Sequence, residues 1–288
     1  MPYVPKEITE EVNVTPVHPL VNVAYLLATV ACVGALIYGG LGLVASQMAL
    51  RMSRQTEEKI GATLVASLPF AADQSDRRVT YLNQLLEKLQ AGAAQTVGPA
   101  QYPPPKVSIL DMPVENAMVT AGSYLFVTDG LLAAVKSENE LAFVLAHELG
   151  HLHHRDPLQA LGRSLVFITL NSLLGLGLGP RSLAGAVNLA ELSYSRQQEI
   201  AADDYAIALM MAHYHHGGHS LGFFERARAR DFDWGALKKV AQWQQTHPLT
   251  DDRIRRIENT FEQNNWPLTG ELTPLPQLIG CPDFEPCQ

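Results

Sequence analysis

A long stretch without charged residues near the N-terminus sets the first constraint on the fold. No Asp, Glu, Lys or Arg occurs between Glu11 and Arg51, and the residues from Leu20 to Ala45 are almost all apolar. As a helix rising about 1.5 Å per residue, this run would cross a hydrocarbon core of about 30 Å with some tilt. It predicts a transmembrane anchor over residues 20–48, with the lipid bilayer as its partner.

Two other interpretations of this run fit less well. Buried helices of soluble proteins rarely extend this far without a charge. A cleaved signal peptide begins with positive charge, whereas the leading segment holds Glu7, Glu10 and Glu11 against Lys6. We therefore expect a single-pass integral membrane protein of the bacterial plasma-membrane or inner-membrane type.

The charges that flank the anchor indicate which side the rest of the chain occupies. Arg51, Arg54 and Lys59 follow the apolar run, and Lys6 precedes it. The positive-inside rule then places the large C-terminal part on the cytoplasmic side. A disulfide between Cys281 and Cys287 would instead require an oxidising compartment, and two unpaired thiols are an equally good interpretation of those cysteines.

The remaining chain predicts a small sheet followed by many helices. Residues 106–110, 116–120 and 123–128 match short strands, the last two as a hairpin. Before them, residues 76–90 carry apolar side chains at helical spacing, and the chain turns helical again after Gly130. This order indicates an α+β fold, mostly helical, that follows one transmembrane helix.

Composition supports a packed domain and excludes some partners. Hydrophobic residues make up 47% of the 288 residues, and the formal net charge is −8, so no nucleic-acid partner is expected. The expected segments are an N-terminal tail, the anchor, the main domain and a C-terminal tail, over residues 1–19, 20–48, 49–270 and 271–288.

A second apolar stretch covers residues 164–179 and ends before Pro180 and Arg181. It is shorter than a usual membrane-spanning helix. A core or interfacial helix is therefore favoured over a second span, although the stretch could dip into the membrane beside the site described next.

Two histidines four residues apart point to a metal site. Ser137 and Glu140 form a capping box for a helix that contains His147-Glu148-Leu149-Gly150-His151. Residues four apart lie on one helix face, so both imidazoles can reach one ion. Glu148 lies beside that face, where a general base acting on a metal-activated water is needed.

A third ligand is available downstream in a segment of helical pattern. Catalytic zinc usually takes three protein ligands, and Glu199 can supply the third. Asp203 lies four residues later on the same face, where its carboxylate could orient a ligand imidazole. The alternative is an acidic surface patch that has no metal.

These motifs resemble those of the HtpX-like and CAAX-prenyl-protease type of membrane zinc metallopeptidase, a gluzincin family. HELGH is followed by SRQQEIAAD, and three further stretches are similar to family elements: Asn116-Ala117, residues 126–132 and residues 246–254. The similarity covers roughly residues 106–260. The fold it implies is a zincin domain with one Zn²⁺ per chain.

The resemblance also implies roles for residues outside the zinc motifs. His247 would bind the oxyanion or occupy the open zinc position in a resting state, and Arg253 would orient the site. The edge strand that begins at Asn116, Ala117 and Met118 would bind an extended polypeptide substrate.

The chain departs from the family in having one clear span, where prenyl proteases have many. It is more similar to single-anchor quality-control members, so the expected function is a zinc endopeptidase that cleaves misfolded or membrane-associated proteins. A membrane chaperone that keeps the fold but rarely cleaves is the main alternative. A zinc hydrolase acting on another bond is the second alternative.

Other histidines are expected to be surface residues. His153 and His154 follow the motif but point away from the zinc face. A second group surrounds an expected helix end, where positive charge is favourable, and a second metal site there is the alternative. Its members are His213, His215, His216 and His219.

Overall fold

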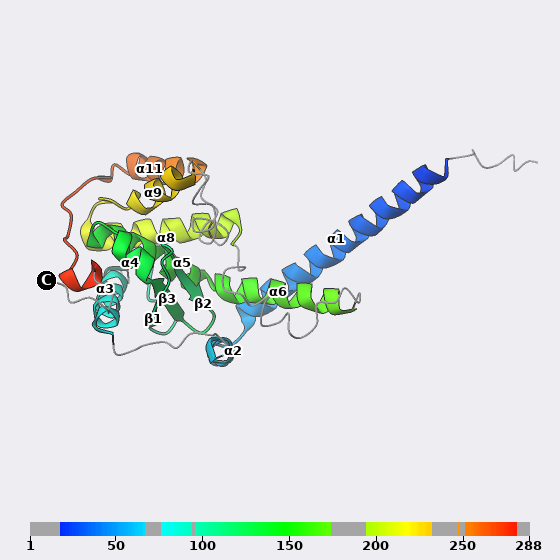
Figure 1. Ribbon diagram of the computed structural model, residues 1–288, viewed down its shortest axis with the longest axis horizontal. Helices are drawn as coiled ribbons and strands as arrows, with labels where there is room; N and C mark the ends of the chain where they lie inside the picture. The colour runs from blue at the N-terminus through cyan, green and yellow to red at the C-terminus, as the bar shows by residue number, and fades with distance from the viewer. Residues whose placement is uncertain are drawn as a thin grey trace, which may run out of the picture.

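The computed structural model describes residues 18–66, 76–93, 96–173, 194–231, 247 and 251–280 of the chain. A single long helix, α1 (Pro19–Arg51), projects away from a domain in which helices surround a small sheet (Figure 1). The α+β class expected from the sequence is confirmed. Cys281, Cys287 and residues 174–179 of the second apolar stretch lie outside the described residues.

The apolar run near the N-terminus forms α1 as expected. Pro19 occupies the first turn, where its missing N–H costs nothing, and His18 accepts a hydrogen bond from the Leu20 N–H. By length and composition α1 is the one described helix that could cross a membrane. Every residue from Pro19 to Leu41 is exposed, and burial begins at Gly42.

The sheet has three strands in the order β1-β3-β2. β1 (Lys106–Leu110) runs parallel to β3 (Tyr124–Thr128), and β2 (Ala117–Thr120) pairs with β3 in the antiparallel sense. The tight turn between β2 and β3 places Gly122 and Ser123 at φ 83° and 61°. The strand order makes β2 an edge strand of the described sheet, and β2 packs against the helix that carries the HELGH motif.

Three helices form the core with this sheet. They are α3 (Arg77–Ala93), α5 (Glu138–His154) and α8 (Arg196–Tyr214), and their inward side chains belong to one hydrophobic cluster. The apolar stripe predicted over residues 76–90 supplies Leu82, Leu85, Leu86 and Leu89, all buried. Smaller elements complete the domain: α2 (Arg54–Ala66), α4 (Asp129–Ala134), α9 (Gly222–Asp231) and α11 (Asp251–Gln263).

Helices α5 and α8 approach each other closely because small residues line their contact. A Cβ added to Gly150 would lie 2.8 Å from the Cα atom of Ala202, which is closer than real Cβ atoms come. Ala202 and Ala206 are completely buried at this contact. The close approach brings the HELGH face of α5 against the Glu199 face of α8.

Helix α6 (Asp156–Leu173) leaves the end of α5 and runs beside the last part of α1 (Figure 1). The two helices meet at Gly162, where an added Cβ would lie 3.4 Å from the carbonyl oxygen of Ala45. Arg155, the left-handed residue that ends α5, donates to the carbonyl oxygens of Leu50 and Met52 and pairs with Glu57. The anchor is therefore tied directly to the helix that carries the metal motif.

Residues 271–280 pack onto the domain. The Thr273 carbonyl accepts from the Glu138 N–H, and the Thr273 N–H donates to Asn139 Oδ1 at 2.8 Å, so the segment covers the N-terminus of α5. It ends in the 3₁₀ turn η2 (Gln277–Gly280), which buries Ile279 in the main core.

Candidate metal centre

The two histidines of the HELGH motif point at one position. Ser137 caps α5 by accepting from the Glu140 N–H, and the helix is buried from its first turn through Leu152. The Nε2 atoms of His147 and His151 lie 3.1 Å apart. Tetrahedral zinc with ligands at about 2.0–2.1 Å holds its ligand atoms about 3.3 Å apart, so this separation fits one shared ion.

Glu199 reaches the same position from α8. Its Oε1 lies 3.5 Å from His151 Nε2, and its Oε2 lies 3.6 Å from His147 Nε2. Burial alone would raise the pKa of Glu199, but His247, His151 and Arg253 outweigh it and hold the pKa below the usual range. Glu199 is therefore an anion in a buried site, which is the form that binds a cation.

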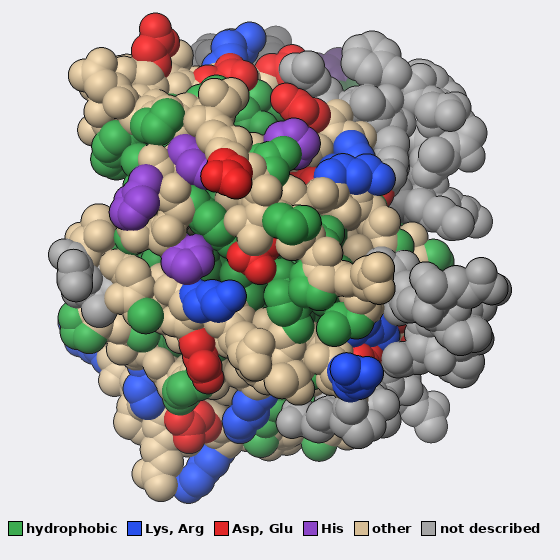
Figure 2. Space-filling view, turned by 90° about the vertical axis from the view of Figure 1, so that its left-hand side faces the viewer, with side chains coloured by type: hydrophobic (Ala, Val, Ile, Leu, Met, Phe, Trp, Pro, Cys, Tyr) green, Lys and Arg blue, Asp and Glu red, His purple; other side chains and the backbone are tan. Residues whose placement is uncertain are grey.

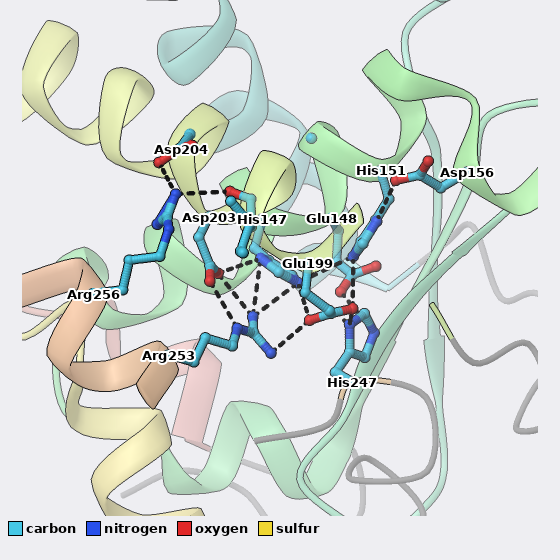
Figure 3. Close-up of polar contacts among 12 residues, drawn as sticks. His147, Glu148, His151, Asp156, Glu199, Asp203, Asp204, His247, Arg253 and Arg256 are labelled. Atoms are coloured by element: carbon cyan, nitrogen blue, oxygen red, sulfur yellow. Dashed lines mark hydrogen bonds and ion pairs between the residues drawn. The ribbon is translucent and has the colours of Figure 1, made fainter. Parts of the chain in front are cut away.

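His247 lies in the same group of side chains (Figure 3). Its Nδ1 is 3.0 Å from Glu199 Oε1 and 3.3 Å from His147 Nε2. Ligand atoms of His147, His151, Glu199 and His247 all lie within 4.8 Å of one another. The set of three imidazoles and one carboxylate matches what zinc prefers, and it would fill four tetrahedral positions.

Each ligand histidine of α5 has its own carboxylate. Asp203 Oδ1 lies 3.0 Å from His147 Nδ1, as expected from the Glu199–Asp203 spacing. Asp156 Oδ2 lies 2.8 Å from His151 Nδ1, and its Oδ1 accepts from Gln198 Nε2 at 2.7 Å. Such contacts fix the ring orientation and leave Nε2 free for a metal.

Asp156 was not predicted from the sequence, and neither was Tyr194. The Tyr194 ring stacks on the His151 ring with centroids 3.9 Å apart and planes 19° apart. Asp156 stands five residues after His151, beyond the end of α5, so helical spacing gives no signal for it. Tyr194 directly precedes the SRQQEIAAD motif, which is the one signal that could have pointed to it.

Arg253 of α11 holds the acidic side of the site together. Its Nε and Nη2 atoms donate to the two oxygens of Asp203 at 2.7 and 2.8 Å, and its Nη1 lies 2.5 Å from Glu199 Oε2. Burial alone would raise the pKa of Asp203, but Arg253 and His147 lower it to about 2. Arg253 thereby holds in place both Glu199, the third ligand, and Asp203, the carboxylate that contacts His147.

Glu148 is placed beside the ligand group. Its carboxylate is buried, and neither oxygen has a hydrogen-bond partner among the described residues. His247 Nε2 lies 3.4 Å from its Oε1. Burial raises the pKa of Glu148 despite the nearby imidazoles, which favours a carboxylate that readily accepts a proton.

Asn116, Ala117 and Met118 lie where the edge strand meets the site. Within the described part of the chain, both polar atoms of the buried Asn116 side chain lack a hydrogen-bond partner. Met118 packs in a small cluster with Tyr194, the residue that stacks on His151. The start of β2 is therefore adjacent to the metal position.

The remaining histidines stay apart from the site. His153 contacts the Tyr205 ring, and His154 Nδ1 contacts the Gly150 carbonyl. Histidine side chains gather on the end face of the domain remote from α1 (Figure 2), where α8 ends. Within the described ranges, the group of His147, His151, Glu199 and His247 is the only one suited to a metal ion.

Comparison with known proteins identifies the family. The sequence profile described as "Peptidase family M48" matches residues 80–261, which is most of the domain and contains every side chain of the ligand group. The chain belongs to peptidase family M48. Together with the relatives described next, this match confirms the resemblance to HtpX-like membrane metallopeptidases.

Curated relatives agree with this assignment. The chain is 30% identical to "Mitochondrial metalloendopeptidase OMA1" of Schizosaccharomyces pombe over 53% of this chain and 45% of that protein. It is 34% identical to a "Protease HtpX homolog" of Acidiphilium cryptum over 42% of this chain and 50% of that protein. A "Protease HtpX homolog" of Pyrococcus abyssi is 27% identical over 82% of this chain and 93% of that protein. The chain thus spans about half the length of the first two relatives.

Proposed function

We propose that this M48 protein is a membrane-anchored zinc endopeptidase. The observation that carries the proposal is the convergence of His147 Nε2, His151 Nε2 and a Glu199 oxygen at separations that suit one tetrahedral ion. Zinc, when bound there, would supply a Lewis acid that polarises a water and the scissile carbonyl. Asp203 and Asp156 would orient the two imidazoles.

Glu148 is the proposed general base. It would take a proton from the attacking water and pass it to the nitrogen of the leaving amine as the carbon–nitrogen bond breaks. Burial supports this role because it raises the pKa of Glu148 toward the pH at which the residue must work.

His247 and Arg253 are proposed to serve the oxyanion and the resting state. His247 is close enough to Glu199 and His147 to occupy the fourth position around the ion before substrate arrives. After moving away from that position, its imidazole could donate to the oxyanion of the tetrahedral intermediate. Arg253 would keep Glu199 in place while His247 moves.

Substrate binding is proposed at the edge of β2. An extended polypeptide could pair with the outer edge of β2 at Ala117 and Met118, adding a strand through backbone hydrogen bonds. The buried amide of Asn116, which has no hydrogen-bond partner among the described residues, could pair with a substrate carbonyl or N–H. Misfolded or membrane-associated proteins are the proposed substrates, because the anchor confines the site to the bilayer surface.

The proposed topology is a single pass with the domain on the cytoplasmic side. Residues 1–19 form the tail, residues 20–48 the anchor, and residues 49–270 the peptidase domain. The contacts made by residues 271–280 support counting that part of the tail with the domain. A reporter fused after residue 288 tests which side of the membrane the domain occupies. If the proposal is right, a reporter that works only in the cytoplasm should be active, and one that works only outside it should not.

The decisive experiment compares wild type with Glu148→Gln in detergent, using casein digestion and zinc analysis. The variant should bind one zinc per chain and cleave at least about 100-fold more slowly, because it retains the ligands and loses the base. Full activity in Glu148→Gln would refute the mechanism. A zinc-loaded wild type that cleaves no protein would favour the chaperone alternative.

A further inference from the structure

A cleft lies between the membrane anchor and the part of the domain that holds the metal site, beside the contact of α1 with α6. It measures about 760 Å³ and is lined by the last turns of α1, the first turns of α6 and the start of α8. Its inner wall includes Asp156 and Tyr194, both of which contact the His151 ring. Its outer wall is the small-residue face of α1 around Gly39, Gly42 and Ser46.

The exposure of α1 places this cleft at the level of lipid headgroups. Residues 19–41 are all exposed, a length of about 35 Å at about 1.5 Å per residue, and a hydrocarbon core is about 30 Å thick. The domain first covers the helix at Gly42, which lines the cleft. If the exposed part of α1 fills the membrane, the cleft opens into the headgroup region.

Among the described residues that line the cleft, Arg163 is the one Lys or Arg, and it is half-buried. Its Cγ lies against α1, 3.9 Å from the position of a Cβ at Gly42. Among the described residues no carboxylate pairs with it, whereas Arg155 of the neighbouring turn pairs with Glu57. Asp156, the acid in the same lining, is already engaged by His151 and Gln198.

We propose that this cleft binds an anionic phospholipid, with the headgroup phosphate at Arg163 and the headgroup hydroxyls near Ser46 and Gln47. The proposal rests on the membrane anchorage in the proposed function. An arginine that faces an interface without an acidic partner is suited to a phosphate.

A polypeptide fits this cleft less well than a lipid does. The cleft walls are helices, whose backbone groups are already hydrogen-bonded within each helix, so they offer no edge to an extended chain. The edge strand β2 provides that edge elsewhere. The cleft also touches α1, which is itself surrounded by lipid in the proposed topology.

The test counts lipids bound to the full-length protein in detergent by native mass spectrometry. The probes are dioctanoyl phosphatidylglycerol, which is anionic, and dioctanoyl phosphatidylcholine, which is zwitterionic. Wild type should prefer the anionic lipid by roughly fivefold to tenfold, as expected for one arginine at an interface. Arg163→Gln should abolish that preference, and Ser46→Phe should do the same by filling the cleft while keeping the charge.

Arg51→Gln is the matched control. Arg51 is exposed at the end of α1, close to the same membrane level but outside the cleft lining, so its loss should leave the preference intact. Three results would overturn the proposal: a preference retained in Arg163→Gln, an equal loss in Arg51→Gln, or displacement of the lipid by equimolar inorganic phosphate. Lower cleavage of a membrane-inserted substrate by Arg163→Gln, with unchanged lipid preference, would assign the cleft to a polypeptide instead.

The readout separates this proposal from the proposed function. Lipid counting needs no peptidase activity, so a protein that prefers phosphatidylglycerol but cleaves nothing would overturn only the endopeptidase. An active enzyme without lipid preference would overturn only the lipid site.

Discussion

Asp156 holds His151 through a 2.8 Å contact between Oδ2 and Nδ1, although the two residues belong to different helices. Asp156 is the first residue of α6, and the same helix runs beside the anchor. One carboxylate therefore connects a metal-ligand imidazole to the helix that packs against α1. The opposite histidine, His147, has its carboxylate on α8.

Asp156→Asn should weaken zinc binding by about 10- to 100-fold, because an amide orients and polarises the imidazole less well than a carboxylate does. Competition with a chelating dye measures the change in affinity. Asp204→Asn is the control, since Asp204 is an exposed carboxylate on α8 that pairs with Arg256. Equal zinc affinity in Asp156→Asn and wild type would remove Asp156 from the site.

Tyr194 should act through its ring rather than its hydroxyl. Tyr194→Phe keeps the stack on His151 and should retain nearly wild-type zinc affinity, whereas Tyr194→Leu should lose roughly threefold to tenfold, as expected for an aromatic pair. The same dye competition, run on both variants, distinguishes the two. If Phe is as harmful as Leu, the hydroxyl carries the effect and the stacking argument is wrong.

Much of the fold and part of the site could be predicted from the sequence because they depend on local spacing. The four-residue intervals between His147 and His151 and between Glu199 and Asp203 place each pair on one helix face. In the structure these faces meet, with Glu199 near the Nε2 atoms of both histidines and Asp203 at Nδ1 of His147. The anchor and the strands follow equally from composition and pattern. The parallel pairing of β1 with β3 has no local signal and was not predicted.

Asp156 shows where local reasoning stops. Arg155 ends α5 with a left-handed backbone, φ 58°, and that turn resets the direction of every later side chain. A residue five positions from His151 could therefore point anywhere. His247 was placed by resemblance alone, since it belongs to no described helix or strand, and Tyr194 reaches His151 only through tertiary packing.

The α5–α8 contact should tolerate no side chain at Gly150. In Gly150→Ala the new methyl would meet the backbone of Ala202, so the helices must separate, and the unfolding free energy should fall by about 1 to 3 kcal/mol. Thermal unfolding of the metal-free protein in detergent measures this. Gly34→Ala is the control, because that glycine has open space around it on α1. Similar melting temperatures for the two variants would contradict the packing argument.

Metal removal should destabilise the domain as well as inactivate it. Only the folded chain brings His147, His151, Glu199 and His247 together, so zinc at about 1,000 times its Kd should add about 4 kcal/mol to the unfolding free energy. A chelator should therefore lower the Tm, and zinc should restore it while Mg²⁺, which prefers oxygen ligands, should not. His147→Ala should show no zinc-dependent shift. A wild-type Tm that changes with neither chelator nor zinc would mean that these four side chains do not bind a zinc ion that stabilises the fold.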